Sequence, residues 1–218
     1  MNKLILGLLL TLILTSFNLP VKKNYFDGQL IKNNGDVIEA SIKLFSFDAK
    51  NITYIEGDKK QKIKSADLKD VKMVIRDSTV TLNKYQSAKY SGMGKLKENP
   101  GEVWMQEIFV AENVNGYNML VLERGGATGS GTFASGLFFS VYYGLKLKAA
   151  PKDNVFYFPM DINWEREDTP KAFNVIFRKS LAKYLKDYCP AIAKKIKKGD
   201  NSIDEFEKTL EQLNNACH

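Results

Sequence analysis

Carboxylate groups gather around a tryptophan about three quarters of the way along the chain. The cluster consists of Asp161, Trp164, Glu165, Glu167 and Asp168. Paired carboxylates beside an aromatic ring can serve glycoside hydrolysis, and they can also bind sugar or calcium. Acidic residues are equally favoured just ahead of a helix, because the helix N-terminus carries partial positive charge. We therefore interpret the carboxylates mainly as helix caps, keep Trp164 as a candidate ligand-binding residue, and keep a carboxylate-based hydrolase as an alternative.

A glycine-rich stretch at 125–136 is the second candidate site. Gly126 and Gly131 have the spacing of a phosphate-binding loop, but Thr132 stands where that motif requires lysine. No helical pattern follows, so no helix N-terminus is available to bind phosphate. We expect Gly126, Gly129 and Gly131 to form a connection that could act as a lip over a ligand cavity.

A histidine-based site and a calcium loop at 200–211 are not expected. The one histidine, His218, is the last residue, and chain ends fray. A calcium loop requires glycine at its sixth position, where this chain has Glu205. The sequence predicts no catalytic residue, no metal site and no cofactor, although four calcium-loop positions are matched by Asp200, Ser202, Asp204 and Glu211.

Cys189 and Cys217 are the only cysteines, and two thiols would favour one structural disulfide if the chain is exported. The geometry of this pairing is open. If the last two helices form a hairpin near Asp200, Cys217 lies about six residues, or roughly 9 Å, beyond the position opposite Cys189. A disulfide needs Cα atoms within about 7 Å, so a crossing angle or a frayed chain end would have to close the gap.

An apolar run at residues 4–14 follows Lys3 and precedes Thr15, Ser16 and Pro20. It is about half the roughly 20 residues that a membrane-spanning helix needs. A basic start, a short apolar centre and a small-residue exit are typical of an export signal. We expect a signal peptide at 1–18, a mature chain in the periplasm or at the cell surface, and no transmembrane segment after its removal.

The formal net charge is +7, and lysine supplies nearly all of the basic residues. Proteins that read nucleic acids usually concentrate arginine and interleave aromatics, whereas this chain has four scattered arginines. We interpret the lysines as a solvated surface and expect no nucleic-acid partner. Weak adhesion to acidic polymers or membrane surfaces is kept as an alternative.

Short strands with turns are predicted from residue 25 to residue 159. The Asn34–Gly35 pair predicts a type I′ hairpin turn, Gly57–Asp58 a second turn, and the link 112–116 a third. Residues 84–101 lack periodicity and are predicted to be a long loop. The strand spacing favours an antiparallel β-sandwich or a partly open barrel, with strands at 29–32, 37–44, 51–55, 61–64, 71–75, 80–82, 103–110, 117–123, 137–148 and 154–159.

Helical periodicity begins at Asp168 and continues to the C-terminus. Cys189–Pro190 ends the first helix, Gly199 stops a short second one, and Ser202–Glu205 has the pattern of a capping box that starts a third. Apolar stripes on these helices need a partner surface. We expect an α+β protein with a β-rich body at 19–160 and helices at 161–218 docked on it, the first helix burying Phe173, Ile176, Phe177, Leu181, Leu185 and Tyr188.

The hairpin at 29–38 and the helix–Cys-Pro–helix pattern at 184–213 carry a resemblance. The chain loosely resembles uncharacterised exported proteins of Bacteroidetes-type bacteria, and this resemblance implies only a location in the cell envelope. Our first functional hypothesis is a non-enzymatic exported protein that binds a protein, glycan or lipid of the envelope or supports it. The alternatives are a carrier of a small apolar ligand or lipid between sheet and helices, and the carboxylate-based hydrolase.

Overall fold

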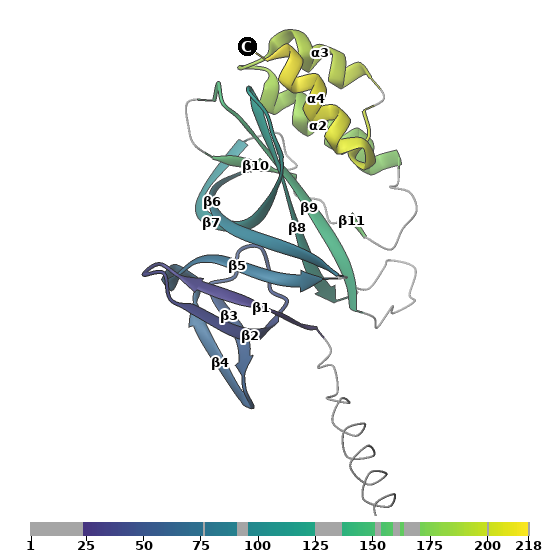
Figure 1. The fold of residues 1–218 in the computed structure, drawn as a ribbon. Coiled ribbons are helices and arrows are strands. Elements are labelled where there is room, and N and C mark those ends of the chain that lie inside the picture. The colour runs from purple at the N-terminus through teal and green to yellow at the C-terminus, as the bar shows by residue number, and fades with distance from the viewer. Residues whose placement is uncertain are drawn as a thin grey trace, which may run out of the picture.

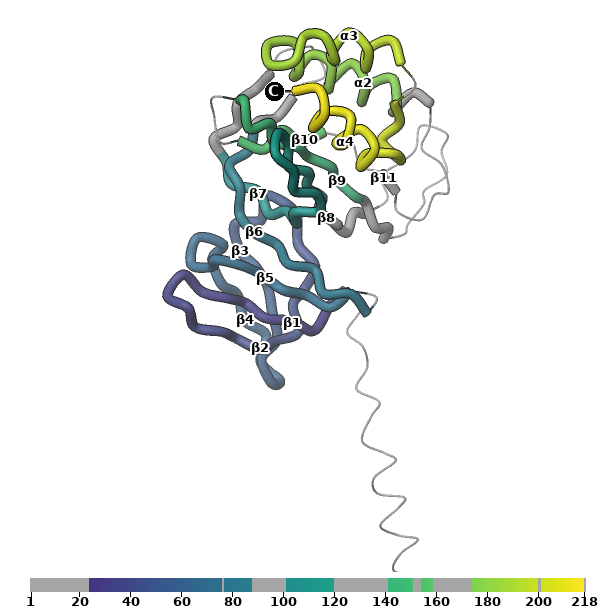
Figure 2. The backbone as a smooth tube through the Cα atoms, turned by 45° about the horizontal axis from the view of Figure 1, so that its top comes forward, coloured from purple at the N-terminus to yellow at the C-terminus, as the bar shows by residue number. Residues whose placement is uncertain are grey.

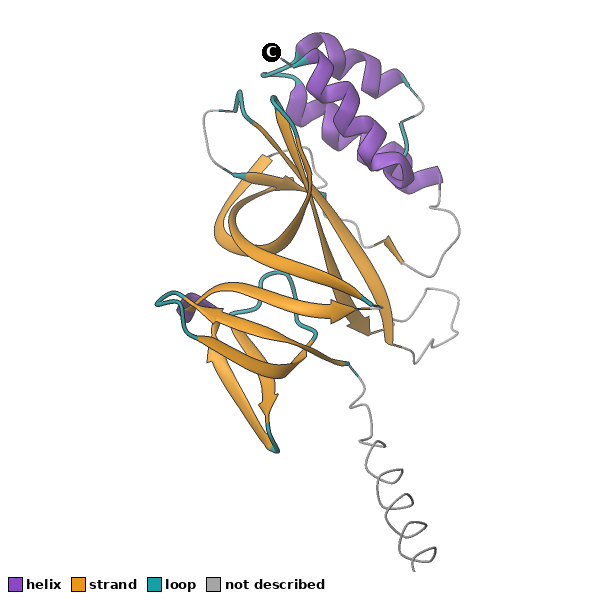
Figure 3. Ribbon diagram, viewed as in Figure 1, coloured by secondary structure: helices purple, strands orange, loops and turns teal. Residues whose placement is uncertain are grey.

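The computed structural model describes residues 24–75, 77–90, 96–124, 137–150, 154–158, 162–163, 171–199 and 201–217. Within these residues the strands precede the α-helices, which confirms the predicted α+β class (Figures 1 and 3). The strands are β1 Tyr25–Lys32, β2 Val37–Lys43, β3 Asn51–Glu56, β4 Lys59–Lys64, β5 Leu68–Ile75, β6 Ser78–Tyr90, β7 Leu96–Val110, β8 Val114–Arg124, β9 Leu137–Leu147, β10 Val155–Tyr157 and β11 Ile162–Asn163. The helices are α2 Lys171–Leu185, α3 Pro190–Lys198 and α4 Phe206–Ala216, with 3-10 turns at Ser65–Asp67 and Ile203–Glu205.

All eleven strands belong to one sheet, in the order β10-β9-β8-β7-β6-β5-β1-β2-β3-β4, with β11 on β9. Strand β10 also pairs in parallel with β6, through Val155 opposite Ser87. Strands β6, β7, β8, β9 and β10 therefore form a closed ring in which each strand is hydrogen-bonded to its neighbours. From β6 the sheet continues outward through β5, β1, β2, β3 and β4. The helices gather at one end of the molecule and β1 to β4 lie at the other (Figures 1 and 2).

The predicted loop at 84–101 is wrong, because β6 and β7 extend through most of it. Their pairing runs from Asn83 opposite Met105 to Tyr90 opposite Leu96. The register shifts between Gln86 and Ala88, and this irregularity accommodates Pro100, which cannot donate to a regular ladder. Strand β6 also pairs with β10, which lies far away in the sequence. The residues around 84–101 give no sign of this pairing.

Two predicted turns also differ in detail. A type I′ turn needs positive φ at both central residues, but in the first hairpin only Gly35 has it, with φ of +91°. The Gly35 N–H donates to the Lys32 carbonyl at 3.0 Å, and Lys32 N–H donates to the Asp36 carbonyl at 2.9 Å. In the third hairpin, Gly116 lies inside β8, and the chain turns at residues 111–113.

Side chains of β10 and of Phe158, which follows it, belong alternately to two hydrophobic cores. Val155 and Tyr157 join the sheet core, which is enclosed by the curved sheet, whereas Phe156 and Phe158 join the helix core between β8–β10 and the helices. Burying each such side chain is worth about 1.5–3 kcal/mol, so this three-residue strand ties the two cores together. The helix core includes Val114, Leu145, Leu147, Phe177, Leu181, Leu185, Ile192, Ile196, Phe206, Leu210 and Leu213.

The predicted buried face of the first helix is confirmed at Phe177, Leu181 and Leu185, each fully buried. Ile176 is 44% exposed, so its predicted place in the core is wrong. It lies beside Val175, which is also exposed, in the first half of α2. The side chain of Phe173 lies outside the described residues.

The predicted capping box at Ser202 is replaced by a tighter turn. The Ser202 hydroxyl accepts from Asp204 N–H at 3.2 Å, and the Glu205 N–H donates to the Ser202 carbonyl at 3.2 Å, which makes a 3-10 turn. Asn174 of α2 adds a bond from outside the segment, because its Oδ1 accepts from Ile203 N–H at 3.0 Å. Tertiary contact with α2 therefore fixes this helix start.

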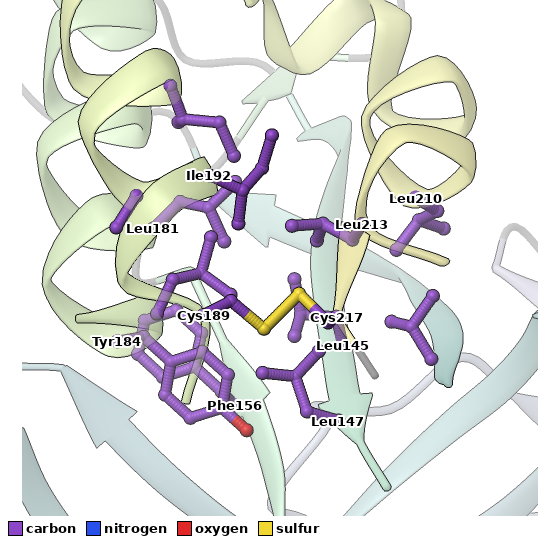
Figure 4. Close-up of a cluster of buried hydrophobic side chains, with 14 of the residues drawn as sticks. Leu145, Leu147, Phe156, Leu181, Tyr184, Cys189, Ile192, Leu210, Leu213 and Cys217 are labelled. Atoms are coloured by element: carbon purple, nitrogen blue, oxygen red, sulfur yellow. A yellow bond between two sulfur atoms is a disulfide. The ribbon is translucent and has the colours of Figure 1, made fainter. Parts of the chain in front are cut away.

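Cys189 and Cys217 form the predicted disulfide, with Cα atoms 5.5 Å apart (Figure 4). The residues flank helices rather than lying inside them: Cys189 immediately precedes α3 and Cys217 immediately follows α4. Helix α4 packs against β8, whereas α3 packs against α2, so the assumed hairpin of the last two helices does not describe their packing. This arrangement removes the 9 Å gap that the hairpin implied.

Candidate functional site

The ligand-binding residues predicted from sequence lie outside the described part of the chain. They are Trp164, Gly126, Gly129 and Gly131, and the carboxylates Asp161, Glu165, Glu167 and Asp168 lie outside it as well. The structure therefore neither brings these residues together nor separates them. The candidate site described below comes from other residues.

Large side chains fill the interface between the sheet and the helices. Phe156 stacks on Tyr184 with ring centroids 4.5 Å apart, and Phe158 packs edge-on against Phe177 at 4.8 Å. The disulfide lies in the same cluster, near Leu145 and Leu213 (Figure 4). The described side chains thus pack this interface as a core, and the surface grooves lie elsewhere.

Helices α2 and α3 enclose a surface groove of about 690 Å³. A four-residue turn at 186–189 joins them, and Ile192 and Ile196 hold α3 against the helix core. The lining combines an apolar floor with two lysine banks: Lys179, Lys183 and Lys186 come from α2 and its end, and Lys194 and Lys197 come from α3. We call these eight residues the lysine groove; its floor consists of Ala182, Pro190 and Ala193.

The lysines of this groove are all exposed, whereas Ala182 and Ala193 are each only 7% exposed. Small side chains at the floor leave a concave space between the helices, and the lysine side chains lie on either side of it. No acidic side chain is among the eight lining residues. The groove therefore presents hydrogen-bond donors and positive charge over an apolar base.

Positive charge is concentrated in this part of the chain. Residues 171–199 carry nine basic and one acidic side chain, a net charge of +8, against +7 for the whole protein. Residues 201–217, which include α4, carry four acidic and one basic side chain, a net charge of −3. The net charge of the whole chain does not show that positive and negative charges are separated between these two segments. Net charges calculated for each predicted helix would have shown it.

A second pocket of about 700 Å³ lies over Trp104, but its polar groups bind one another. Lys84 Nζ donates to the Ser65 carbonyl at 3.2 Å and lies 5.8 Å from the centre of the Trp104 ring. Trp104 Nε1 donates to Ser65 Oγ at 3.3 Å, and Glu102 lies 4.0 Å from Lys84. Charges of both signs line this pocket, so it has weaker electrostatic selectivity than the lysine groove.

The buried tyrosines provide no nucleophile or base near neutral pH. Burial raises the pKa of Tyr117 well above its usual value and that of Tyr85 to about 12. Their rings lie 4.7 Å apart near Glu107, which accepts from Asn115 Nδ2 at 2.8 Å. Both phenols therefore remain protonated, and this cluster serves as polar packing.

Within the described residues, no group of three or more histidine, cysteine, aspartate or glutamate side chains could hold a metal ion. None of the helices in the described ranges combines the length and apolarity needed to cross a bilayer. No family model, no curated protein and no solved structure matches the chain. The fold and the lysine groove thus define an α+β protein with a concave basic surface on its helical end.

Proposed function

We propose that this protein is a non-enzymatic, exported protein that binds an anionic partner in the cell envelope through the lysine groove. The observation that carries the proposal is the placement of five exposed lysines around one concave surface. Each exposed pair with an anion is worth only about 0.2–1 kcal/mol, so useful affinity requires several pairs at once. A groove with lysines on both sides provides this multiplicity.

Two further observations support the proposal. The disulfide between Cys189 and Cys217 suits an oxidising compartment, in agreement with the export signal expected at 1–18. The dense packing of the helix core favours a surface-binding role over carriage of an apolar ligand between sheet and helices. The lysine groove requires neither a catalytic group nor a cofactor for this role.

Binding to anionic probes tests the proposal directly. Purified mature protein is titrated with an alginate hexamer, poly-L-glutamate and anionic phospholipid vesicles, and binding is measured by microscale thermophoresis. We expect at least one probe to bind, and its binding to be lost in 1 M NaCl, where the Debye length is about 3 Å. Lys183→Glu/Lys194→Glu should abolish this binding.

The matched control is Lys60→Glu/Lys62→Glu, which makes the same charge change on exposed residues of β4. It should bind like the wild type. Equal loss in both variants would show that only net charge matters and would refute a role for the groove. Reproducible turnover on a broad hydrolase panel would refute the non-enzymatic part, and an uncleaved leader on cytosolic protein would refute export.

A further inference from the structure

Asn–Gly pairs occur twice in the chain, and the fold places them in opposite surroundings. Asn34 and Gly35, the turn pair, lie in the exposed turn between β1 and β2. Asn115 and Gly116, the sheet pair, lie inside β8, between β7 and β9. We infer that Asn34 is a site of spontaneous deamidation, at which the backbone nitrogen of Gly35 displaces the side-chain amide, whereas the sheet pair resists the same reaction.

The reaction involves the turn pair and water. The Gly35 nitrogen loses its proton to solvent and attacks Cγ of Asn34, so that a new bond joins these two atoms. The bond from Cγ to Nδ2 breaks, and the amide nitrogen takes up a proton from solvent and leaves as ammonia. Water then opens the resulting cyclic imide at either carbonyl carbon, which gives aspartate or isoaspartate. Glycine favours the attack because no Cβ hinders its nitrogen.

The turn exposes the Asn34 side chain and polarises its carbonyl group. Residues 33–37 are all exposed. Asn34 Oδ1 accepts from Asp36 N–H at 3.1 Å, a bond that asparagine often makes in turns. This bond withdraws electrons from Cγ and stabilises the negative charge that develops on Oδ1 during the attack. Gly35 N–H donates to the Lys32 carbonyl at 3.0 Å, and an exposed turn bond of this kind opens more readily than a central ladder.

The sheet pair consists of the same two residue types in a closed environment. Gly116 is paired with Phe109 on one side and with Leu145 on the other. Leu210 fills the space beside it, because a Cβ at Gly116 would lie 2.2 Å from Leu210 Cδ1. Asn115 Oδ1 is buried, and no donor in the described part of the chain reaches it. Ring closure requires rotation of the Asn115 backbone, which would break the pairing, so this site reacts only after the sheet opens.

Conversion of Asn34 changes the charge of the turn. Asn34 Nδ2 donates to Asp36 Oδ2 at 2.9 Å, and this bond lowers the pKa of Asp36, as does Lys32. The product replaces that donor with a second carboxylate beside Asp36, and isoaspartate also lengthens the backbone by one carbon atom. Lys32 N–H donates to the Asp36 carbonyl across the turn at 2.9 Å. We therefore expect this N–H to lose protection against hydrogen exchange in the converted protein.

The test follows both sites in one sample by peptide mass spectrometry. Native mature protein is incubated at mildly alkaline pH in water labelled with heavy oxygen, which marks conversion during the incubation. Asn34 should convert, and the rate at Asn115 should be lower by at least about tenfold, because it requires opening of the sheet. After unfolding in urea the two rates should become similar. Asn34→Gln, which would have to form a larger ring, should suppress conversion at this position.

The comparison of native and unfolded protein decides between the outcomes. Fast conversion at Asn34 and slow conversion at Asn115 in the native protein, with similar rates after unfolding, supports the proposal. If Asn34 converts in the unfolded chain but not in the native protein, the turn protects it and the proposal is overturned. Equal native rates at the two sites also overturn it, because the fold then does not discriminate. Unchanged hydrogen exchange at Lys32 in Asn34→Asp and in the converted protein would refute the effect on the turn.

Discussion

Replacing Gly116 by alanine should loosen the docking of α4 on the sheet. An alanine Cβ at this position would lie 2.2 Å from Leu210 Cδ1 and 3.1 Å from Phe109 Cβ. Leu210 is fully buried in the helix core, so its side chain has little space into which it can rotate. Either Leu210 adopts a strained rotamer or α4 moves outward.

The expected cost follows from this overlap. Overpacking a dense core costs about 1–3 kcal/mol, and the 2.2 Å approach places Gly116→Ala near the upper end of that range. Leu210→Ala should cost about 2–5 kcal/mol through its cavity. In the double variant the new methyl group enters the space that Leu210 vacates. We therefore expect the double variant to be about as stable as Leu210→Ala alone, with a coupling energy of about 1–3 kcal/mol.

Urea denaturation followed by far-UV circular dichroism measures the four members of this cycle. Val110→Ala is the control, because Val110 lies near the same hairpin and is 67% exposed; its effect should stay within about 0.5 kcal/mol. Strict additivity of Gly116→Ala and Leu210→Ala would refute the reasoning. It would mean that α4 does not press on β8 at this glycine.

The remaining predictions concern the disulfide, the tyrosines and the helix start. Cys189→Ala/Cys217→Ala frees a loop with a sequence separation of 28 residues and should cost about 3.6 kcal/mol in the chain-entropy model, lowering Tm by about 7–14 °C in calorimetry; an unchanged Tm would contradict this. Burial raises the pKa of Tyr157 to about 12, so the unfolded chain releases this proton first, near pH 10. The free energy of unfolding should be constant below pH 10 and should fall between pH 10 and pH 12. In Tyr157→Phe the urea midpoint should change less over this pH interval than in the wild type. If both proteins show the same change, Tyr157 is not its cause. Asn174→Ala removes the acceptor for Ile203 N–H and should cost about 1–3 kcal/mol in urea denaturation, whereas exposed Asn215→Ala should cost under about 0.5; equal effects would exclude the cap.

Local patterns were sufficient for the strands and helices with strong periodicity. The hairpin between β1 and β2, the helix break at Pro190 and the helix end at Lys198 follow from residues close together in sequence. The long pairing of β6 with β7 was missed, because a register shift interrupts the alternation of residues and because β10, the second partner of β6, comes from a distant part of the chain. The lysine groove was missed for a similar reason: its two banks are separated by a turn and meet only when α3 packs on α2.

The sequence by itself determined the α+β class, the helix boundaries to within a few residues and the presence of two cysteines, because these depend on short-range periodicity, caps and composition. Only the tertiary structure decided that β10 joins two cores, that the Leu210 side chain packs directly against the backbone of Gly116, and that five lysines surround one groove. These features depend on which distant segments meet. That choice is set by the summed burial of many side chains, and no local stretch of the chain contains it.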